Sequence, residues 1–277
     1  MEIEIADQLA ILGHPQRLAV FRLLMRRYPG RVASGELATA LGIKASTMST
    51  YLAALARAGL VEQARAGTSI FYTVDMTAVR RMFGVLFTEC CRGRPDLCLP
   101  FDRGATPMTD RTYNVLFICT GNSARSIFAE SILRRAAGDR FTAFSAGTRP
   151  GTKLNDFAVQ VLQDKGHDVS VLRSKDISEF SGPDAPRLDF VFTVCDQAAN
   201  EECPAWDGQP VSGHWGMPDP VKAEGTDAQK ALAFQHAYGA LKNRIEAFTA
   251  LPIASLDRIA LQSAVDQIGR TSPEELA

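Results

Sequence analysis

The 277-residue sequence lacks the features that mark membrane, secreted and repetitive proteins. No apolar run approaches the ~18 residues that a helix needs to span a bilayer. The opening Met-Glu-Ile-Glu-Ile is acidic, without the basic stretch and apolar core of a signal peptide. Internal repeats and low-complexity tracts are absent as well. These absences predict a cytoplasmic protein that folds into ordinary domains and has no membrane partner.

A strong charge of one sign is missing overall, since the net charge is −1, but the balance differs along the chain. Residues 1–95 contain 12 Lys and Arg against 7 Asp and Glu, whereas residues 96–277 contain 18 against 24. The apolar fraction of 46% is typical of a globular protein, and the length suits two domains. A basic first third favours a polyanionic partner such as DNA.

Cysteine occurs six times, and its distribution is more informative than its number. In a cytoplasmic chain, cysteines indicate metal binding or redox chemistry rather than a static disulfide framework. Three of them gather near residues 90–98, and the other three follow expected strands or loops of the second half. The six are Cys90, Cys91, Cys98, Cys119, Cys195 and Cys203.

The first third has the pattern of a winged helix-turn-helix domain, mostly helical with a β wing. Apolar spacing predicts helices over residues 5–28, 36–41 and 44–59, a β-hairpin over 60–74 and a further helix over 75–91. Pro15 interrupts the first helix, and Ser34 is the expected N-cap of the second. Two helices joined by a short turn are the helix-turn-helix arrangement.

The pattern changes after the Gly- and Pro-containing residues 92–110. Strands then alternate with helices, which predicts an α/β three-layer domain around a parallel four-stranded sheet. Strands are expected over residues 113–119, 141–145, 188–195 and 211–214, and helices over 125–137, 155–165, 226–250 and 255–268. The predicted organisation is a DNA-binding domain over 1–91, a linker with the end of the cysteine cluster over 92–110, and an α/β domain over 111–277.

The loop after the first of these strands carries the strongest functional signal. Its sequence is Cys119-Thr-Gly-Asn-Ser-Ala-Arg125-Ser126, and it opens a helix. Gly121 permits a tight turn, so that successive amides and the positive helix end face an oxyanion, and Arg125 can hold two of its oxygens. The same field is expected to lower the pKa of Cys119. The expected anion-binding residues are Thr120, Gly121, Asn122, Ser123, Ala124, Arg125 and Ser126.

Residues 113–270 resemble the low-molecular-weight tyrosine phosphatase superfamily, and within it the thioredoxin-coupled arsenate reductases. The resemblance rests on this loop, on Ser145-Ala-Gly-Thr and on Trp215-Gly-Met-Pro-Asp219-Pro. Without the resemblance, the favoured interpretation of Asp219 is a turn residue before Pro220. The roles that the resemblance implies are Cys119 as nucleophile, Arg125 as oxyanion clamp, Asn122 and Ser126 as holders of loop and thiolate, and Asp219 as general acid.

The choice between reduction and hydrolysis depends on further thiols, because reducing arsenate takes two electrons and hydrolysing a phosphate ester takes none. The resemblance implies that Cys195 attacks the arsenic adduct of Cys119 and releases arsenite. Cys203 then takes over the disulfide and presents it to thioredoxin, the expected electron donor, with no bound cofactor. Because a disulfide needs Cα atoms within about 7 Å, the polar residues 196–202 are expected to form a loop that moves.

Two alternatives remain open for the second domain. One is a phosphotyrosine phosphatase fused to a DNA-binding regulator, although Val221 and Lys222 stand where the phosphatases carry aromatic residues. The other is a regulator whose second domain senses arsenate or phosphate without turnover.

The first domain resembles the ArsR family of dimeric metal-responsive repressors. The resemblance rests on Leu12-Gly-His-Pro-Gln-Arg-Leu, on the helix-turn-helix and on Leu55-Ala-Arg-Ala-Gly-Leu-Val. It implies a homodimer through this domain that binds a DNA operator, and the alternative is a winged helix used only for dimerisation. The expected DNA contacts are Ser46, Thr47, Ser49, Thr50, Tyr51 and Arg65.

Three cysteines at the end of this domain suggest how DNA binding is controlled. Cys90, Cys91 and Cys98 offer three thiolates, which suit a soft trigonal ion such as As(III) or Sb(III). The alternative is that they are apolar residues of a dimer interface. The combined hypothesis is a repressor that reduces arsenate to arsenite and so produces its own inducer.

Overall fold

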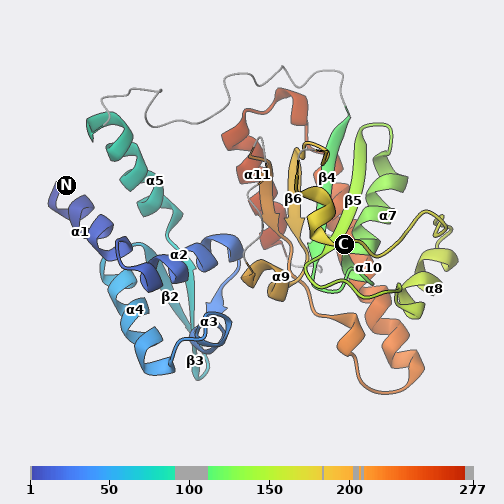
Figure 1. The fold of residues 1–277 in the computed structure, drawn as a ribbon, viewed down its shortest axis with the longest axis horizontal. Helices are drawn as coiled ribbons and strands as arrows, with labels where there is room; N and C mark the ends of the chain where they lie inside the picture. Colours follow the sequence, from blue (N-terminus) through green and yellow to red (C-terminus); the bar gives the residue numbers. More distant parts are fainter. Residues whose placement is uncertain (1, 91–111, 183, 202–205, 207–208, 272–277) are drawn as a thin grey trace. The chain divides into compact units, whose positions relative to one another are not determined.

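The computed structural model describes residues 2–90, 112–182, 184–201, 206 and 209–271 (Figure 1). The chain divides into two compact units, Met1–Ala105 and Thr106–Ala277. The domain boundaries expected at residues 91–92 and 110–111 lie outside the described part. Among the described residues, no helix is both long and apolar enough to cross a membrane.

The first unit is a helical domain with a three-stranded antiparallel sheet of order β1-β3-β2. Its helices are α1 (Glu2–Leu12), α2 (Pro15–Arg27), α3 (Ser34–Ala40), α4 (Ala45–Arg57) and α5 (Met76–Val85), with a π-helical turn at Leu86–Cys90. Its strands are β1 (Val32–Ala33), β2 (Val61–Ala66) and β3 (Ser69–Val74). The helix-turn-helix is α3 and α4, and the wing is β2 and β3, as the sequence predicts.

Local sequence explains where this unit differs from expectation. The single helix expected over residues 5–28 is two helices, because Pro15 has no amide hydrogen and therefore begins α2 rather than continuing α1. Ser34 is not an N-cap: it is the first residue of α3, and Ala33 precedes it. The core holds the helices together through buried Leu23, Leu37 and Leu52.

The second unit is built on a four-stranded parallel sheet of order β5-β4-β6-β7, which confirms the expected fold class (Figure 1). The strands are β4 (Tyr113–Cys119), β5 (Phe141–Gly147), β6 (Phe190–Thr193) and β7 (Val211–His214). The helices are α7 (Arg125–Ala137), α8 (Asp156–Asp164), α9 (Asp196–Asn200), α10 (Asp227–Thr249) and α11 (Arg258–Arg270). Short 3-10 turns lie at Ile177–Phe180, Pro220–Lys222 and Ile253–Ser255.

The central strands place the thiols. Val115 to Ile118 of β4 are fully buried, as expected for a parallel strand covered on both faces. Phe192 of β6 stacks on Trp215 with 4.0 Å between ring centroids, which anchors the segment that follows β7. Cys119 ends β4 and Cys195 lies just beyond β6, so both thiols lie at the carboxyl edge of the sheet, where such folds bind ligands.

The polar stretch after β6 is not the loop that was expected. Asp196–Asn200 forms the short helix α9, and Cys195 is its N-cap, with the sulfur accepting a hydrogen bond from the Ala198 amide at 3.3 Å. Cysteine is an uncommon N-cap residue, and the polar composition of residues 196–202 favoured a loop, so the sequence did not indicate this helix. Helix α11 packs on β7.

Candidate active site

The loop from Cys119 to Arg125 is held from outside by the segment after β5. Four of its carbonyl oxygens accept backbone hydrogen bonds of 2.9–3.1 Å from that segment. The pairs, donor first, are Thr148 to Cys119, Arg149 to Thr120, Gly151 to Gly121 and Asn155 to Ser123. In a trans peptide the carbonyl and the following N–H point in opposite directions. Carbonyls turned outward therefore direct the next amides inward, where an oxyanion would sit.

The tight turn of this loop lies at Asn122, one residue later than expected. Asn122 has φ +43°, in the left-handed region, and Gly121 does not need that freedom. Asparagine tolerates this conformation when its side chain is well bonded. The glycine that the loop requires is Gly147, because a Cβ there would lie 2.7 Å from the Thr120 carbonyl oxygen.

Asn122 connects the loop to its surroundings through three hydrogen bonds. Its Nδ2 donates to the Oγ atoms of Ser126 and Ser145, at 2.9 and 2.8 Å, and its Oδ1 accepts from the Lys175 amide at 2.7 Å. The side chain is completely buried. Asn122 thus connects the loop to α7, to β5 and to the backbone of Lys175.

Cys119 is a buried thiol with two polar neighbours. Its Sγ lies 2.9 Å from the Ser126 Oγ and accepts from the Asn122 amide at 3.2 Å. Burial raises the pKa of Cys119, and this effect outweighs the lowering by the Ser126 hydrogen bond and the Arg125 charge. The expectation of a lowered pKa for Cys119 is therefore wrong.

Arg125 is held in place by two contacts of its guanidinium group. One guanidinium nitrogen donates to the Met217 carbonyl at 3.1 Å, and another pairs with Asp219 Oδ2 at 2.9 Å. Asp219 also caps the following turn through the Val221 amide, at 3.2 Å. The expected clamp and the expected acid are thus brought together by direct contact.

The second thiol lies beside the same loop. Cys195 Sγ is 3.4 Å from the Oγ1 of Thr120, the residue that follows Cys119, and both sulfurs are buried. Cys203 lies outside the described residues.

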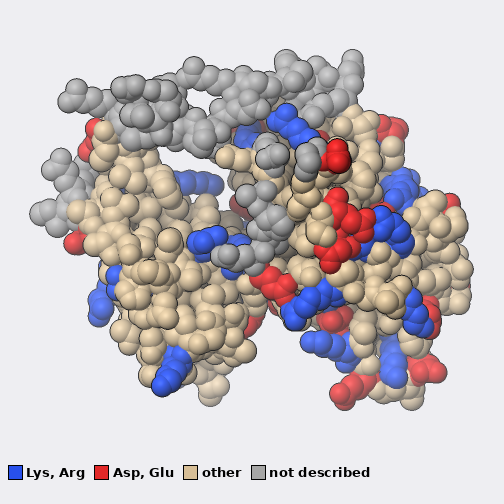
Figure 2. All heavy atoms as spheres, viewed as in Figure 1, with Lys and Arg blue, Asp and Glu red and all other residues tan. Residues whose placement is uncertain are grey.

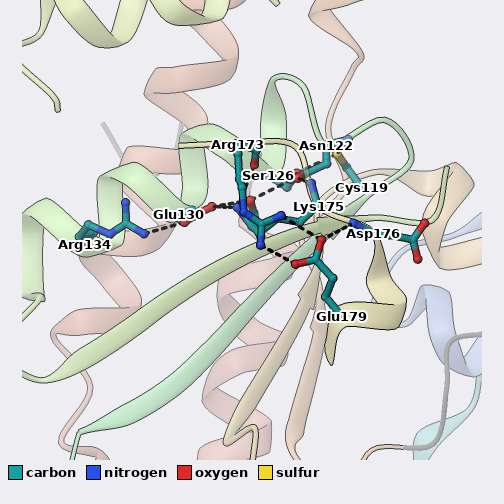
Figure 3. A network of polar contacts seen from close by, with 10 residues as sticks. Cys119, Asn122, Ser126, Glu130, Arg134, Arg173, Lys175, Asp176 and Glu179 are labelled. Atoms are coloured by element: carbon teal, nitrogen blue, oxygen red, sulfur yellow. Dashed lines mark hydrogen bonds and ion pairs between the residues drawn. The ribbon is translucent and has the colours of Figure 1, made fainter. Parts of the chain in front are cut away.

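A buried ion pair supports the loop from behind, and sequence reasoning missed it (Figure 3). Glu130, on α7, accepts from Ser145 Oγ at 2.5 Å, from Lys175 Nζ at 2.9 Å and from Arg134 at 2.6 Å. Glu130 follows Ser126 by one helical turn, and this i, i+4 spacing was the available signal. In the part of the chain that the structure describes, no group of His, Cys, Asp and Glu could hold a metal ion.

The expected DNA-contacting residues lie on α4 and the wing. Ser46, Ser49 and Thr50 are exposed, and the last two donate to carbonyls of their own helix, at 3.0 and 3.2 Å. Tyr51 is engaged locally, since its hydroxyl bonds Gln16 and its ring lies 5.2 Å from that of His14.

On the face of the first unit seen in Figure 2, Lys and Arg lie singly among uncharged residues. Arg65 of the wing is exposed. Cys90 is exposed at the end of the π-helical turn, whereas Cys91 and Cys98 lie outside the described residues.

Comparison with known proteins matches each unit separately. Residues 114–260 match the family described as low molecular weight phosphotyrosine protein phosphatase, and residues 12–64 match a helix-turn-helix domain. The chain is 36% identical over 135 residues to the arsenate reductase of Bacillus licheniformis, covering 48% of this chain and 93% of that protein. It is also 36% identical over 134 residues to that of Halalkalibacterium halodurans, with the same coverage. A Corynebacterium glutamicum thioredoxin-dependent arsenate reductase structure aligns with TM-score 0.37 and 20% identity, covering 77% of this chain and 90% of that one.

Proposed function

The chain belongs to the low molecular weight phosphotyrosine protein phosphatase family, joined to a helix-turn-helix domain, and we propose that its family domain reduces arsenate to arsenite. The observation that carries the proposal is the second buried thiol, Cys195, in contact with the anion loop through Thr120. Hydrolysis of a phosphate ester has no use for that thiol, whereas reduction requires it. The identity to arsenate reductases supports the same choice.

The first step forms an arsenic–sulfur bond. Arsenate binds to the inward amides and Arg125, and Cys119 attacks arsenic: HAsO4 2− + Cys119–SH gives Cys119–S–AsO3 2− + H2O. The leaving hydroxyl already carries one hydrogen. Asp219, paired with Arg125, protonates it so that it departs as water, and the hydrogen of the Cys119 thiol replaces the proton that Asp219 gave up.

The second step transfers the electrons. Cys195 attacks the Cys119 sulfur, a disulfide forms between the two, and the electron pair of the S–As bond stays on arsenic as arsenite, HAsO3 2−. Cys203 then attacks Cys195, which frees Cys119 and leaves a Cys195–Cys203 disulfide for reduction by a dithiol of the thioredoxin class. No resident cofactor is needed, since all electrons pass through sulfur.

One assay tests this reaction against its alternatives. Arsenate-dependent NADPH oxidation is measured with thioredoxin and its reductase, beside hydrolysis of an aryl phosphate. We expect oxidation, and we expect Cys195→Ser to abolish it while leaving any ester hydrolysis within about twofold; Cys90→Ser, an exposed cysteine of the other unit, is the matched control. Robust hydrolysis without oxidation would make the chain a phosphatase, and neither activity would make it an oxyanion sensor.

For the first unit, residues 1–91, we propose an arsenite-responsive repressor that binds operator DNA as a homodimer. The helix-turn-helix match and the exposed hydroxyls on α4 support DNA binding. Cys90, Cys91 and Cys98 are proposed to bind As(III) or Sb(III), so that arsenite made by residues 111–277 releases the DNA. Operator binding by the full chain is measured with and without arsenite. Release that is lost in Cys90→Ser supports the proposal, and binding unaffected by arsenite rejects it.

A further inference from the structure

His214, at the end of β7, makes two side-chain contacts that lead to the second thiol. Its Nδ1 lies 2.8 Å from Thr193 Oγ1 at the end of β6, and its Nε2 lies 3.0 Å from Asp196 Oδ1. The His214 side chain is 6% exposed and that of Asp196 is 55% exposed. A buried imidazole is thus fixed at one nitrogen by the sheet, and the other nitrogen holds a surface carboxylate.

Asp196 directly follows Cys195 in the chain. Fixing the Asp196 side chain therefore restricts the backbone that aims the Cys195 sulfur at Thr120 of the anion loop. Cys195 is also the N-cap of α9, with its sulfur 3.3 Å from the Ala198 amide. The pair of His214 and Asp196 thus acts on the residue whose placement decides the second step of the proposed reaction.

The glycine after Trp215 is shaped around this pair. A Cβ on Gly216 would lie 2.5 Å from Asp196 Oδ1 and 2.5 Å from His214 Nε2, closer than real Cβ contacts. Any side chain at position 216 would push the two groups apart. Glycine at position 216 thus leaves the room in which the His214–Asp196 contact forms.

The same short segment also holds the anion clamp. Buried Arg244 of α10 donates to the carbonyls of Trp215 and Gly216, at 2.9 and 3.3 Å. Two residues on from Trp215, the Met217 carbonyl accepts from Arg125. Residues 214–219 thus contact Arg125, the proposed oxyanion clamp, through Met217 and Asp219. At its other end the segment holds Asp196, the neighbour of Cys195, through His214.

We propose that His214 and Asp196 are positioning residues that hold Cys195 in attacking range of the Cys119 adduct. The proposal rests on arsenate reduction by this site, but the placement of Cys195 can be measured without arsenate. Proximity effects are steep: a displacement of about 1 Å can slow a reaction on the order of 100-fold. Loss of the His214–Asp196 contact is expected to slow formation of the disulfide between Cys119 and Cys195. Reactions that involve Cys119 without Cys195 are expected to keep their rate.

The test uses the full chain carrying Cys203→Ser, so that oxidation stops at the Cys119–Cys195 disulfide. One arm mixes the chain with arsenate in a single turnover, and the other uses diamide, which takes two electrons and two protons from a dithiol. Disulfide peptides are quantified by mass spectrometry. Asp196→Ala should slow the disulfide about 10- to 100-fold in both arms. The rate at which iodoacetamide alkylates Cys119 should stay within about twofold.

Three further variants distinguish a change in the position of Cys195 from general damage to the fold. Asp196→Asn keeps an oxygen acceptor and should restore most of the rate. Gly216→Ala should slow both disulfide formation and arsenate binding, because it disturbs both ends of the segment. Glu246→Ala removes an exposed ion pair of α10, with Lys242, and should change neither.

The outcomes are distinct for the two proposals. If Asp196→Ala forms the disulfide at the parent rate, the positioning role is overturned. If the parent chain does not reduce arsenate but the diamide arm still shows the loss in Asp196→Ala, arsenate reduction fails and the positioning role stands. Asp196 is exposed, so this substitution keeps the fold; equal near-ultraviolet circular dichroism of the two proteins verifies it.

Discussion

Lys175→Met tests how far the buried pair behind the anion loop stabilises the second unit. The Lys175 and Glu130 side chains are 7% and 3% exposed, and their charged atoms lie 2.9 Å apart. Methionine keeps most of the volume of lysine and removes the charge. Glu130 then stays buried, and among the described residues it keeps Arg134 and Ser145 as partners.

The expected loss in the free energy of unfolding follows from leaving Glu130 buried without its partner Lys175. Removing one partner of such a pair typically costs about 3–5 kcal/mol. Arg134 is 40% exposed and still reaches Glu130, so it offsets part of this cost and places the expected loss near the lower end, at about 3 kcal/mol. With a urea dependence of about 2 kcal/mol/M, the midpoint should fall by about 1.5 M.

Tryptophan fluorescence reports this loss for the second unit alone, because both tryptophans, Trp206 and Trp215, belong to it. Glu130→Gln and the double variant complete a double-mutant cycle. If charge pairing is the cause, the double variant is destabilised by clearly less than the sum of the two single variants. A loss below about 1 kcal/mol in Lys175→Met, or simple additivity, would refute the reasoning.

Further measurements test other parts of the site. Because burial raises the pKa of Cys119, the rate of Cys119 alkylation should be low at pH 7. The rate should rise with pH through a midpoint above the ordinary thiol value of about 8.5. A midpoint below that value would contradict the burial argument. Arg125→Lys keeps the charge but loses the fork that spans Met217 and Asp219, so arsenate affinity should fall at least about tenfold by isothermal calorimetry. Burial, aided by Arg135, lowers the pKa of His167, so the unfolded chain binds its proton first. Unfolding stability should therefore drop as pH falls below about 6.5, and His167→Gln should flatten that drop in the fluorescence assay.

Periodicity and motif spacing predicted most of the second unit because its signals are local. A run of buried residues such as Val115 to Ile118 specifies a parallel strand by itself. The loop motif places Cys119 and Arg125 at a strand end and a helix start, respectively, which the structure confirms. The helix expected over residues 125–137 matches α7 residue for residue.

The parts that could not be predicted depend on contacts between distant residues. Glu130 and Lys175 are 45 positions apart, and nothing in either neighbourhood indicates that the two charges meet in the interior. Likewise, the need for glycine at position 147 arises from the Thr120 carbonyl, which only the parallel register of β4 and β5 brings near. Helix α9 was missed because its cap is a sulfur rather than an oxygen.

The sequence predicted the wrong direction for the pKa shift of Cys119, because only the groups that favour a thiolate were counted. Ser126 and Arg125 both do so, but burial of the thiol outweighs them. The Cys119 proton must therefore leave during the first step, because the thiolate is the attacking form of a cysteine. In the proposed reaction this proton is balanced by the water that departs from arsenate. The alkylation profile of Cys119 thus measures how strongly the site holds the proton that the first step has to remove.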